Sequence, residues 1–543
     1  MKSKNRTKKV ENMKSVATEL FKEFREHSVS EFFRKNAAML GYTGKIRSLT
    51  TIVHEGVTNA IDAAEEAGVL PSVLVAIKKV DESTEHFKVV IEDNASGIPE
   101  KYIADVFGKM LAGTKLHRHM QSRGQQGIGI SGAVMFSQIT SGKPTMVTTS
   151  EGDGEIINAN VMINVDKNEG KLLNGRKSKG DWRGTRVELE AKDVAYVRSR
   201  YGPFNYLRMT AIANPHVQIT FVEPDGTLTI FERAGDKIPE RPKSMPLHPW
   251  GIMSDDLLAL AKHTKGRTIG SFLVTELSRV TKGKVKEVQK LSGIDMNKKP
   301  SELDWEDAEK IVSAFKQIKF MAPPTEGLRP VGAADVERGM RQILNPEFVY
   351  TTTRSPKVYR GGLPFIVEAG IAHGGSAGKS VEVGVVEGEE AETGGLELIR
   401  FANRAPLIFD QGGCAITAAA RNIDWRRYGV DVTAAPVTLF VNVVSAYVPY
   451  TSAGKQSIAD EPEVFNEIRA AIMDVARELR QYLYRKIRTK ERQQRAGIFE
   501  QYLPVIARKA AHLAGKKVPE VSKLIEKVAG VKIGGKEQTS EES

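Results

Sequence analysis

The sequence of 543 residues contains one cysteine, Cys414, and few aromatic residues, which make up 7% of the chain. A single cysteine excludes an intrachain disulfide and any zinc site built on several cysteines. The sequence also has no run of about 18 to 20 apolar residues, the length of a membrane span, and its first residues, MKSKNRTKKVENMK, lack the apolar segment of a signal peptide. We therefore expect a soluble protein of the reducing cytoplasm.

The charge is unevenly distributed. The net charge is +12, from 79 basic and 67 acidic residues. The segment Arg477 to Lys536 holds 16 Lys or Arg against 5 Glu, a net of +11, so nearly the whole excess lies near the end of the chain. Such a basic arm favours salt-dependent contacts with a nucleic-acid backbone. A solvated helix surface gives the same pattern, and that alternative stays open.

Three polar residues in one apolar segment carry the first chemical pattern. Glu55, Asn59 and Asp62 fall at positions i, i+4 and i+7 of a segment whose apolar residues also recur at helical spacing, so they share one face of a predicted helix. Hydrolysis of a terminal phosphate needs a group that activates water, a metal ion and donors for the developing charge. We interpret Glu55 as the general base and Asn59 as the Mg²⁺ ligand.

Two further segments fit a nucleotide. Residues 87–92 (FKVVIE) predict a strand that delivers Asp93 into a turn containing Gly97, where a carboxylate can accept a hydrogen bond from a purine amino group. Gly124, Gly127 and Gly129 then remove side chains from a loop that enters an apolar helix, which exposes backbone N–H groups to phosphate oxygens.

Two other nucleotide-binding motifs are matched only in part, and we reject both interpretations. Gly127 to Gly132 satisfies the dinucleotide-binding fingerprint, but the preceding residues KLHRHMQSRGQQ are too polar for the buried strand which that fold requires. Gly378-Lys379-Ser380 ends like a Walker phosphate loop, yet His373 stands where the first glycine of that motif belongs.

The ordered motifs resemble the Bergerat-fold ATPases, the superfamily of gyrase-type topoisomerases, MutL, large heat-shock chaperones and histidine kinases. Three longer stretches, SVSEFFRKNAAMLGY, SRGQQGIGISGA and RFANRAPLIFDQG, resemble the B subunits of the topoisomerase VI family. The superfamily usually has glycine where this chain has Ala95. If that position needs a positive φ, alanine costs roughly 1 kcal/mol.

The resemblance implies ATP and Mg²⁺ as cofactors and gives roles to further residues. Asp93 and Thr185 are expected to contact the adenine, and Lys455 to sense the γ-phosphate. Gly97 and a glycine-rich lid are expected to enclose the phosphates. The lid consists of Gly124, Gln125, Gln126, Gly127, Ile128, Gly129, Ile130 and Ser131.

The same resemblance implies an ATPase subunit of a type IIB DNA topoisomerase, associated with the nucleoid. Two copies are expected to dimerise on ATP and to gate the passage of one duplex through a double-strand break made by a separate A subunit, in an A2B2 heterotetramer. A MutL-like repair ATPase and a non-catalytic, nucleotide-gated DNA clamp remain as alternatives. A histidine kinase is disfavoured, because no phosphoacceptor domain fits before Asp93.

We expect an α+β multidomain fold. Its parts are N-terminal strap helices (1–45), a Bergerat-fold α/β sandwich (46–235), a helix-two-turns-helix module (236–320), an α/β transducer domain with a long helix (321–495), and a basic helical extension with a disordered end (496–543). Basic residues of the module are candidates for DNA contacts, and exposed lysines are the simpler explanation.

Hydrophobic periodicity predicts the elements within these parts. Strands are expected at 73–77, 87–91, 145–149, 156–165, 185–189, 364–370, 381–386, 396–402 and 437–444, with two more between 217 and 232. Helices are expected at 12–40, 128–136, 254–303, 333–344 and 461–495, followed by shorter ones at 499–513 and 519–528.

Overall fold

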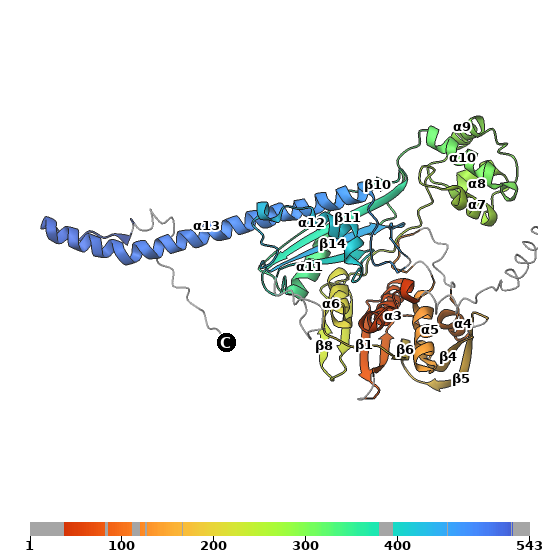
Figure 1. The fold of residues 1–543 in the computed structure, drawn as a ribbon, viewed down its shortest axis with the longest axis horizontal. Helices are drawn as coiled ribbons and strands as arrows, with labels where there is room; N and C mark the ends of the chain where they lie inside the picture. The colour runs from red at the N-terminus through yellow and green to blue at the C-terminus, as the bar shows by residue number, and fades with distance from the viewer. Residues whose placement is uncertain are drawn as a thin grey trace, which may run out of the picture.

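The computed structural model describes residues 37–81, 85–110, 120–124, 127–164, 167–379, 395–452, 454–522 and 524. It contains two β-sheets, a small helical module and one very long helix that projects away from the second sheet (Figure 1). Within the described ranges, no helix is both long and apolar enough to cross a membrane. The predicted helices before residue 37, the predicted strand at 381–386 and the chain beyond 524 lie outside these ranges.

The first sheet has eight strands in the order β5-β4-β3-β6-β2-β1-β7-β8. Only the β1–β7 pair is parallel among its described neighbours. The helices α3, α4, α5 and α6 contact the sheet and one another, so they form a single layer on it. The strands are β1 (Ser72–Lys79), β2 (His86–Asp93), β3 (Thr145–Glu151), β4 (Glu155–Asn164), β5 (Glu169–Lys179), β6 (Arg183–Lys192), β7 (Gln218–Val222) and β8 (Leu228–Phe231). The helices are η1 (Ala37–Leu40), α3 (Lys45–Ala67), α4 (Glu100–Gly108), α5 (Gly129–Ser141) and α6 (Pro203–Ala213).

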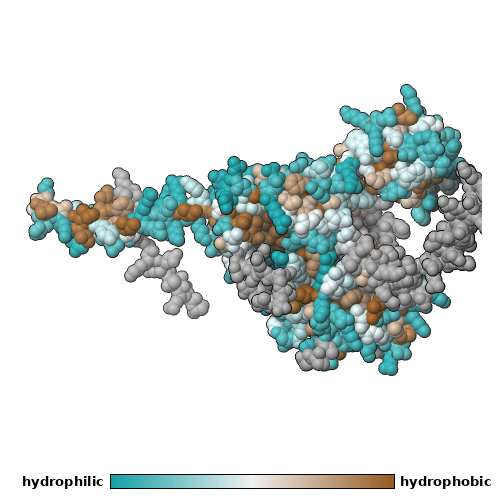
Figure 2. All heavy atoms as spheres, viewed as in Figure 1, coloured by the Kyte–Doolittle hydropathy of each residue, from teal (hydrophilic) through white to brown (hydrophobic). Residues whose placement is uncertain are grey.

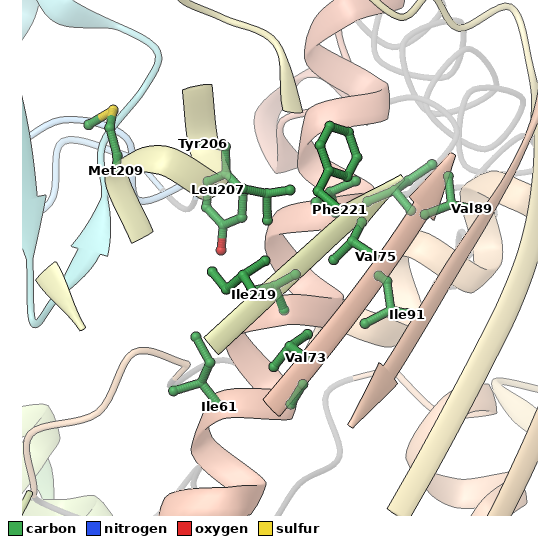
Figure 3. Close-up of a cluster of buried hydrophobic side chains, with 14 of the residues drawn as sticks. Ile61, Val73, Val75, Val89, Ile91, Tyr206, Leu207, Met209, Ile219 and Phe221 are labelled. Carbon is green, nitrogen blue, oxygen red and sulfur yellow. The ribbon is translucent and has the colours of Figure 1, made fainter. Parts of the chain in front are cut away.

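The core of this domain lies between the sheet and the helices. Val73 and Val75 of β1, and Val89 and Ile91 of β2, alternate along their strands and are buried beside Ile61 of α3 (Figure 3). Side chains two apart in a strand point to the same face, so this alternation matches the predicted strands. The predicted α/β sandwich is confirmed.

Three elements of this domain were not predicted. Strand β5 is an edge strand whose side chains are almost all exposed, so it has no hydrophobic alternation to detect. Helix α6 is buried along its whole length and therefore lacks an amphipathic pattern. Helix α4 spans only nine residues, too few for a clear period.

The helical module consists of α7 (Ser254–His263), α8 (Ile269–Glu276), α9 (Lys282–Ser292), η2 (Pro300–Glu302) and α10 (Trp305–Gln317). Three of these helices begin at a residue whose hydroxyl or carboxylate oxygen can cap the helix. Such an oxygen accepts a hydrogen bond from one of the first backbone N–H groups, which have no partner within the helix. Thr268 accepts from Ser271 N at 3.1 Å, and Asp304 accepts from Asp307 N at 2.8 Å. The helical region continues to Gln317, so its predicted end near residue 303 was too early.

The second sheet has the strand order β10-β11-β14-β12-β13, with β9 also paired to β11. β11 and β14 are buried along nearly their whole length, and both α11 and α13 pack against β11. The elements are α11 (Ala333–Leu344), β9 (Phe348–Thr353), β10 (Lys357–Tyr359), β11 (Leu363–His373), β12 (Leu396–Ala402), β13 (Ala405–Pro406), η3 (Gln411–Gly413), α12 (Ala415–Arg421), η4 (Trp425–Tyr428) and β14 (Val437–Ser445).

Helix α13 (Pro462–Ala514) is continuous over 53 residues. The predicted break between residues 495 and 499 is wrong. Gly497 lowers helix stability by only about 1 kcal/mol relative to alanine. Pro504 removes one backbone donor, but the carbonyl left without it belongs to the exposed residue Glu500, where water can satisfy it. Arg354 holds the first half of α13 through Glu467, at 2.7 Å, and Asp474.

A matched pair of substitutions tests where α13 is packed. Ile472 is fully buried, whereas the Ile487 side chain is 58% exposed. We expect Ile472→Ala to destabilise the second domain by about 2 to 5 kcal/mol, because it leaves a cavity in the core. Ile487→Ala serves as the control and should change the stability by less than about 0.5 kcal/mol. Chemical unfolding, followed by circular dichroism, measures the free energy of unfolding of both variants. Equal losses of stability would show that α13 is also packed at Ile487, beyond the second sheet.

Candidate nucleotide site

Helix α3 carries Glu55 and Asn59 into a cavity of about 370 Å³. The helix lies close to the sheet at Gly56, where a Cβ atom would stand 2.2 Å from Ile91 Cδ1. Asp62, the third residue of the predicted polar face, does not line this cavity. Its carboxylate instead accepts a 2.5 Å bond from the buried guanidinium of Arg123. The structure therefore brings together two of the three helix residues and separates Asp62 from them.

Asp93 lies at the end of β2, on another side of the same cavity. Its Oδ1 atom accepts hydrogen bonds from Ala95 N at 2.9 Å and from Thr185 N at 3.1 Å. Burial raises the pKa of Asp93 to about 6, and these two backbone bonds oppose that rise. Because Oδ1 is occupied by two donors, Oδ2 is the oxygen left for a ligand.

The turn after Asp93 accommodates Ala95 without strain. Ala95 is buried, and it is not among the described residues with positive φ, so the expected cost of replacing glycine does not arise. Gly97 does need to be glycine, because its φ is 72° and a Cβ atom would lie 2.2 Å from Ser150 O. The turn is fixed on β3 by Ile98 N, which donates to Thr149 Oγ1 at 2.8 Å.

The glycine-rich segment enters the cavity from α5. Gly124 and all residues from Gly127 to Ser131 line it, while Gln125 and Gln126 lie outside the described residues. Gly129 is the first residue of α5, and a Cβ atom there would stand 1.9 Å from Glu55 Oε2. The Glu55 carboxylate thus lies against the N-terminus of α5, where free backbone N–H groups can also bind anions.

Lys455 reaches the same cavity from the second domain. Burial lowers the pKa of Lys455, and the negative charges of Glu55 and Asp62 act in the opposite direction. Its neighbour Gln456 also lines the cavity, and Gln456 Oε1 accepts from Ile408 N at 3.1 Å. The cavity is therefore shared by both domains.

Sequence reasoning missed the residues that join the two domains. Arg47 of α3 forms a bidentate ion pair with Asp410 at 2.9 and 3.0 Å, and its guanidinium lies 4.6 Å from the centre of the Phe409 ring. The buried Arg400 donates to the carbonyls of Leu407 and Phe409, both at 2.8 Å. Apart from Arg47, these residues belong to the stretch RFANRAPLIFDQG, so the resemblance marked that segment without revealing its contacts.

Comparison with known families agrees with this geometry. Residues 44–189 match the family of histidine kinase-, DNA gyrase B-, and HSP90-like ATPases. Residues 323–495 match the transducer of the topoisomerase VI B subunit. The first domain is accordingly an ATPase domain of this class, and the second is a transducer domain.

Full-length relatives narrow the class further. The B subunit of type 2 DNA topoisomerase 6 from Thermococcus kodakarensis is 52% identical, covering 92% of this chain and 94% of that protein. The corresponding proteins of Thermococcus sibiricus and Methanothermobacter thermautotrophicus are each 50% identical, covering 94% and 95% of this chain and 96% and 97% of those proteins. The chain belongs to the family of topoisomerase VI B subunits, as predicted, and is an ATP-hydrolysing topoisomerase subunit rather than a repair ATPase or a clamp.

Replacing Asp93 by asparagine tests its unusual ionisation. The folded pKa of about 6 exceeds the ordinary 3.8, so the folded protein binds more protons than the unfolded chain between these pH values. The contribution of Asp93 to stability therefore falls as the pH rises from about 4 to 6 and remains unfavourable above that. In thermal unfolding without nucleotide, we expect Asp93→Asn to be more stable than wild type above pH 6, by at most roughly 3 kcal/mol, and equally stable below about pH 4.

The same variant should lose affinity for ATP. With its oxygen held by the two backbone donors, the asparagine would turn its NH2 group toward the adenine amino group, and two donors would face each other. Titration calorimetry at pH 7.5 measures the loss. An unchanged affinity would exclude Asp93 from adenine recognition.

Proposed function

We propose that ATP binds in the shared cavity with its adenine at Asp93 and Thr185 and its phosphates toward the N-terminus of α5. Asp93 and Thr185 are paired across β2 and β6, which supports a common role. Gly97 and the described lid residues, Gly124 and Gly127 to Ser131, leave backbone close to the phosphates. A cavity of about 370 Å³ falls within the usual range for small-molecule sites.

Glu55 is the residue that activates the attacking water. The observation that carries this role is the convergence, in one cavity, of the Glu55 carboxylate, the N-terminus of α5 and the Lys455 ammonium group. A carboxylate can accept the proton of water, while backbone donors and an ammonium group stabilise the charge that develops on the phosphate. Lys455 is the group that contacts the γ-phosphate.

Asn59 is the residue that holds Mg²⁺. Its side chain is exposed and lines the cavity one helical turn after Glu55. Among the described residues, no group of three or more His, Cys, Asp or Glu side chains is arranged to hold a metal ion. This fits Mg²⁺, which usually takes one or two protein ligands and fills its remaining positions with water and substrate phosphates. When bound, the ion would neutralise charge on the phosphates.

Lys455 connects hydrolysis to the position of the transducer domain. An ammonium group that contacts the γ-phosphate binds ATP and ADP differently, and only such a difference can shift a conformational equilibrium. In this proposal, two chains dimerise when ATP is bound and close a gate around one DNA duplex. A partner A subunit makes the double-strand break, in an A2B2 assembly.

The projecting half of α13 supports a role in contacting the A subunit. Figure 2 shows hydrophobic side chains along this half, and most of its apolar residues are exposed. They are Tyr484, Ile487, Ile498, Tyr502, Val505, Ile506 and Leu513. Contiguous exposed apolar surface is typical of protein interaction sites. Lysines and arginines between them are suited to nearby DNA phosphates.

Glu55→Ala tests the hydrolytic role. We expect the variant to bind ATP with nearly wild-type affinity and to lose turnover by about 10²- to 10⁴-fold, because only the water-activating group is removed. Phosphate release and equilibrium nucleotide binding are measured on the same preparation. Turnover at the wild-type rate would remove Glu55 from the mechanism.

Lys455→Ala tests the link between hydrolysis and DNA topology. The chain is mixed with a candidate A subunit and supercoiled plasmid, and phosphate release and plasmid relaxation are followed together. We expect both activities in the wild type and neither in the variant. If the wild type hydrolyses ATP without changing plasmid topology, the gating proposal is wrong.

A further inference from the structure

A tight turn in the transducer domain joins β12 to β13 through Asn403 and Arg404 alone. The φ angles of these residues are 49° and 69°, so both lie in the left-handed region. Two-residue hairpin turns of this kind favour asparagine followed by glycine. Arg404 occupies the glycine position, at a cost of roughly 1 kcal/mol. Contacts made by the Arg404 side chain can offset this cost.

The turn holds residues 120–124, which lead into the phosphate lid and which we term the lid stem. Asn403 Nδ2 donates to Ser122 O at 3.1 Å. Gln121 exchanges two hydrogen bonds with the backbone of Arg329, at 2.7 and 2.9 Å. Arg404 Nη2 donates to the same Arg329 carbonyl at 3.4 Å. Two consecutive stem residues are thus connected to the turn.

The third stem residue is held through a buried charge cluster. Arg123 donates to Asp62 at 2.5 Å, to Glu65 at 2.8 Å and to Asn214 at 2.6 Å. Asn214 Nδ2 donates to Arg404 O at 3.2 Å, and Arg404 Nη1 lies 3.9 Å from Glu65 Oε1. The side chains of Arg123 and Arg404 are only 6% and 8% exposed.

Burial makes this arrangement depend on both domains. Charges removed from water need nearby counter-charges, so separating the domains would leave Glu65 without its second cation and admit water around Arg123. The position of the lid stem therefore depends on the docking of the transducer turn. Arg404 has no place in the nucleotide cavity itself.

We propose that the Asn403–Arg404 turn is a second contact, apart from Lys455, through which the transducer domain acts on the nucleotide site. Arg404 is a positioning residue for the phosphate lid. The proposal rests on the proposed function, because it assumes that the lid binds phosphates. The two contacts differ in one measurable respect. Lys455 contacts only the γ-phosphate and so distinguishes ATP from ADP, whereas the lid encloses the phosphates, including those that both nucleotides share.

Arg404→Gly is the test, because glycine suits the backbone of the turn while the side chain is lost. Arg360→Gly is the matched control. Arg360 has a φ of 46°, lies in the turn between β10 and β11 of the same sheet, and pairs with Glu461 rather than with a residue of the lid stem. Affinities for ADP and for a non-hydrolysable ATP analogue are measured by calorimetry on the full chain.

We expect Arg404→Gly to lower the affinity for both nucleotides, each by about tenfold, which corresponds to the loss of roughly 1.4 kcal/mol. Its melting temperature without nucleotide should stay within a few degrees of wild type. Arg404→Lys keeps the positive charge but lacks the planar guanidinium group with its several N–H donors. This variant should show a smaller loss of nucleotide affinity. Arg360→Gly should bind both nucleotides with wild-type affinity. Lys455→Ala should lower the affinity for the ATP analogue only.

Wild-type affinity in Arg404→Gly would overturn the proposal. So would an equal loss in Arg360→Gly, or a loss confined to the ATP analogue. If Arg404→Gly does not fold, the same criteria apply to Arg404→Lys. Failure of the wild type to bind either nucleotide would overturn the proposed function, and this inference with it.

Discussion

The ion pair between Arg47 and Asp410 holds the beginning of α3 against the transducer domain, and the nucleotide cavity depends on that contact. Glu55 and Asn59 come from α3, whereas Lys455 comes from the other domain. A bidentate pair fixes orientation as well as distance. Because Phe409 also stacks against Tyr201 and lies under the Arg47 guanidinium, the junction combines charge with apolar packing.

Polar groups buried at this junction limit how the domains can move. Glu397 of the transducer domain pairs with Arg208 of α6 and accepts from Thr438. Buried charges tolerate few arrangements, because each must keep a partner or be exposed to water. The domains are therefore expected to exchange between a small number of docked positions rather than to slide continuously.

The local sequence pattern was sufficient to predict much of the nucleotide site. Glu55 and Asn59 lie one helical turn apart, Asp93 follows a short apolar strand, and the lid glycines precede an apolar helix. These features depend on neighbours within about ten residues. The link between Arg123 and Arg404 through Glu65 and Asn214 could not be predicted in this way, because these residues are distant in the chain and both arginines resemble ordinary surface arginines. The polar edge strand β5 was missed for a related reason, since nothing in its sequence requires burial.

The projecting part of α13 can act as a lever arm. The roughly 30 residues beyond Tyr484 extend about 45 Å at 1.5 Å per residue. A rotation of the transducer sheet by about 5° would move the tip by about 4 Å, roughly the width of an atom-to-atom contact, while the atoms near Lys455 shift by much less. Small displacements around a phosphate are thereby enlarged at a remote surface without any change within the helix.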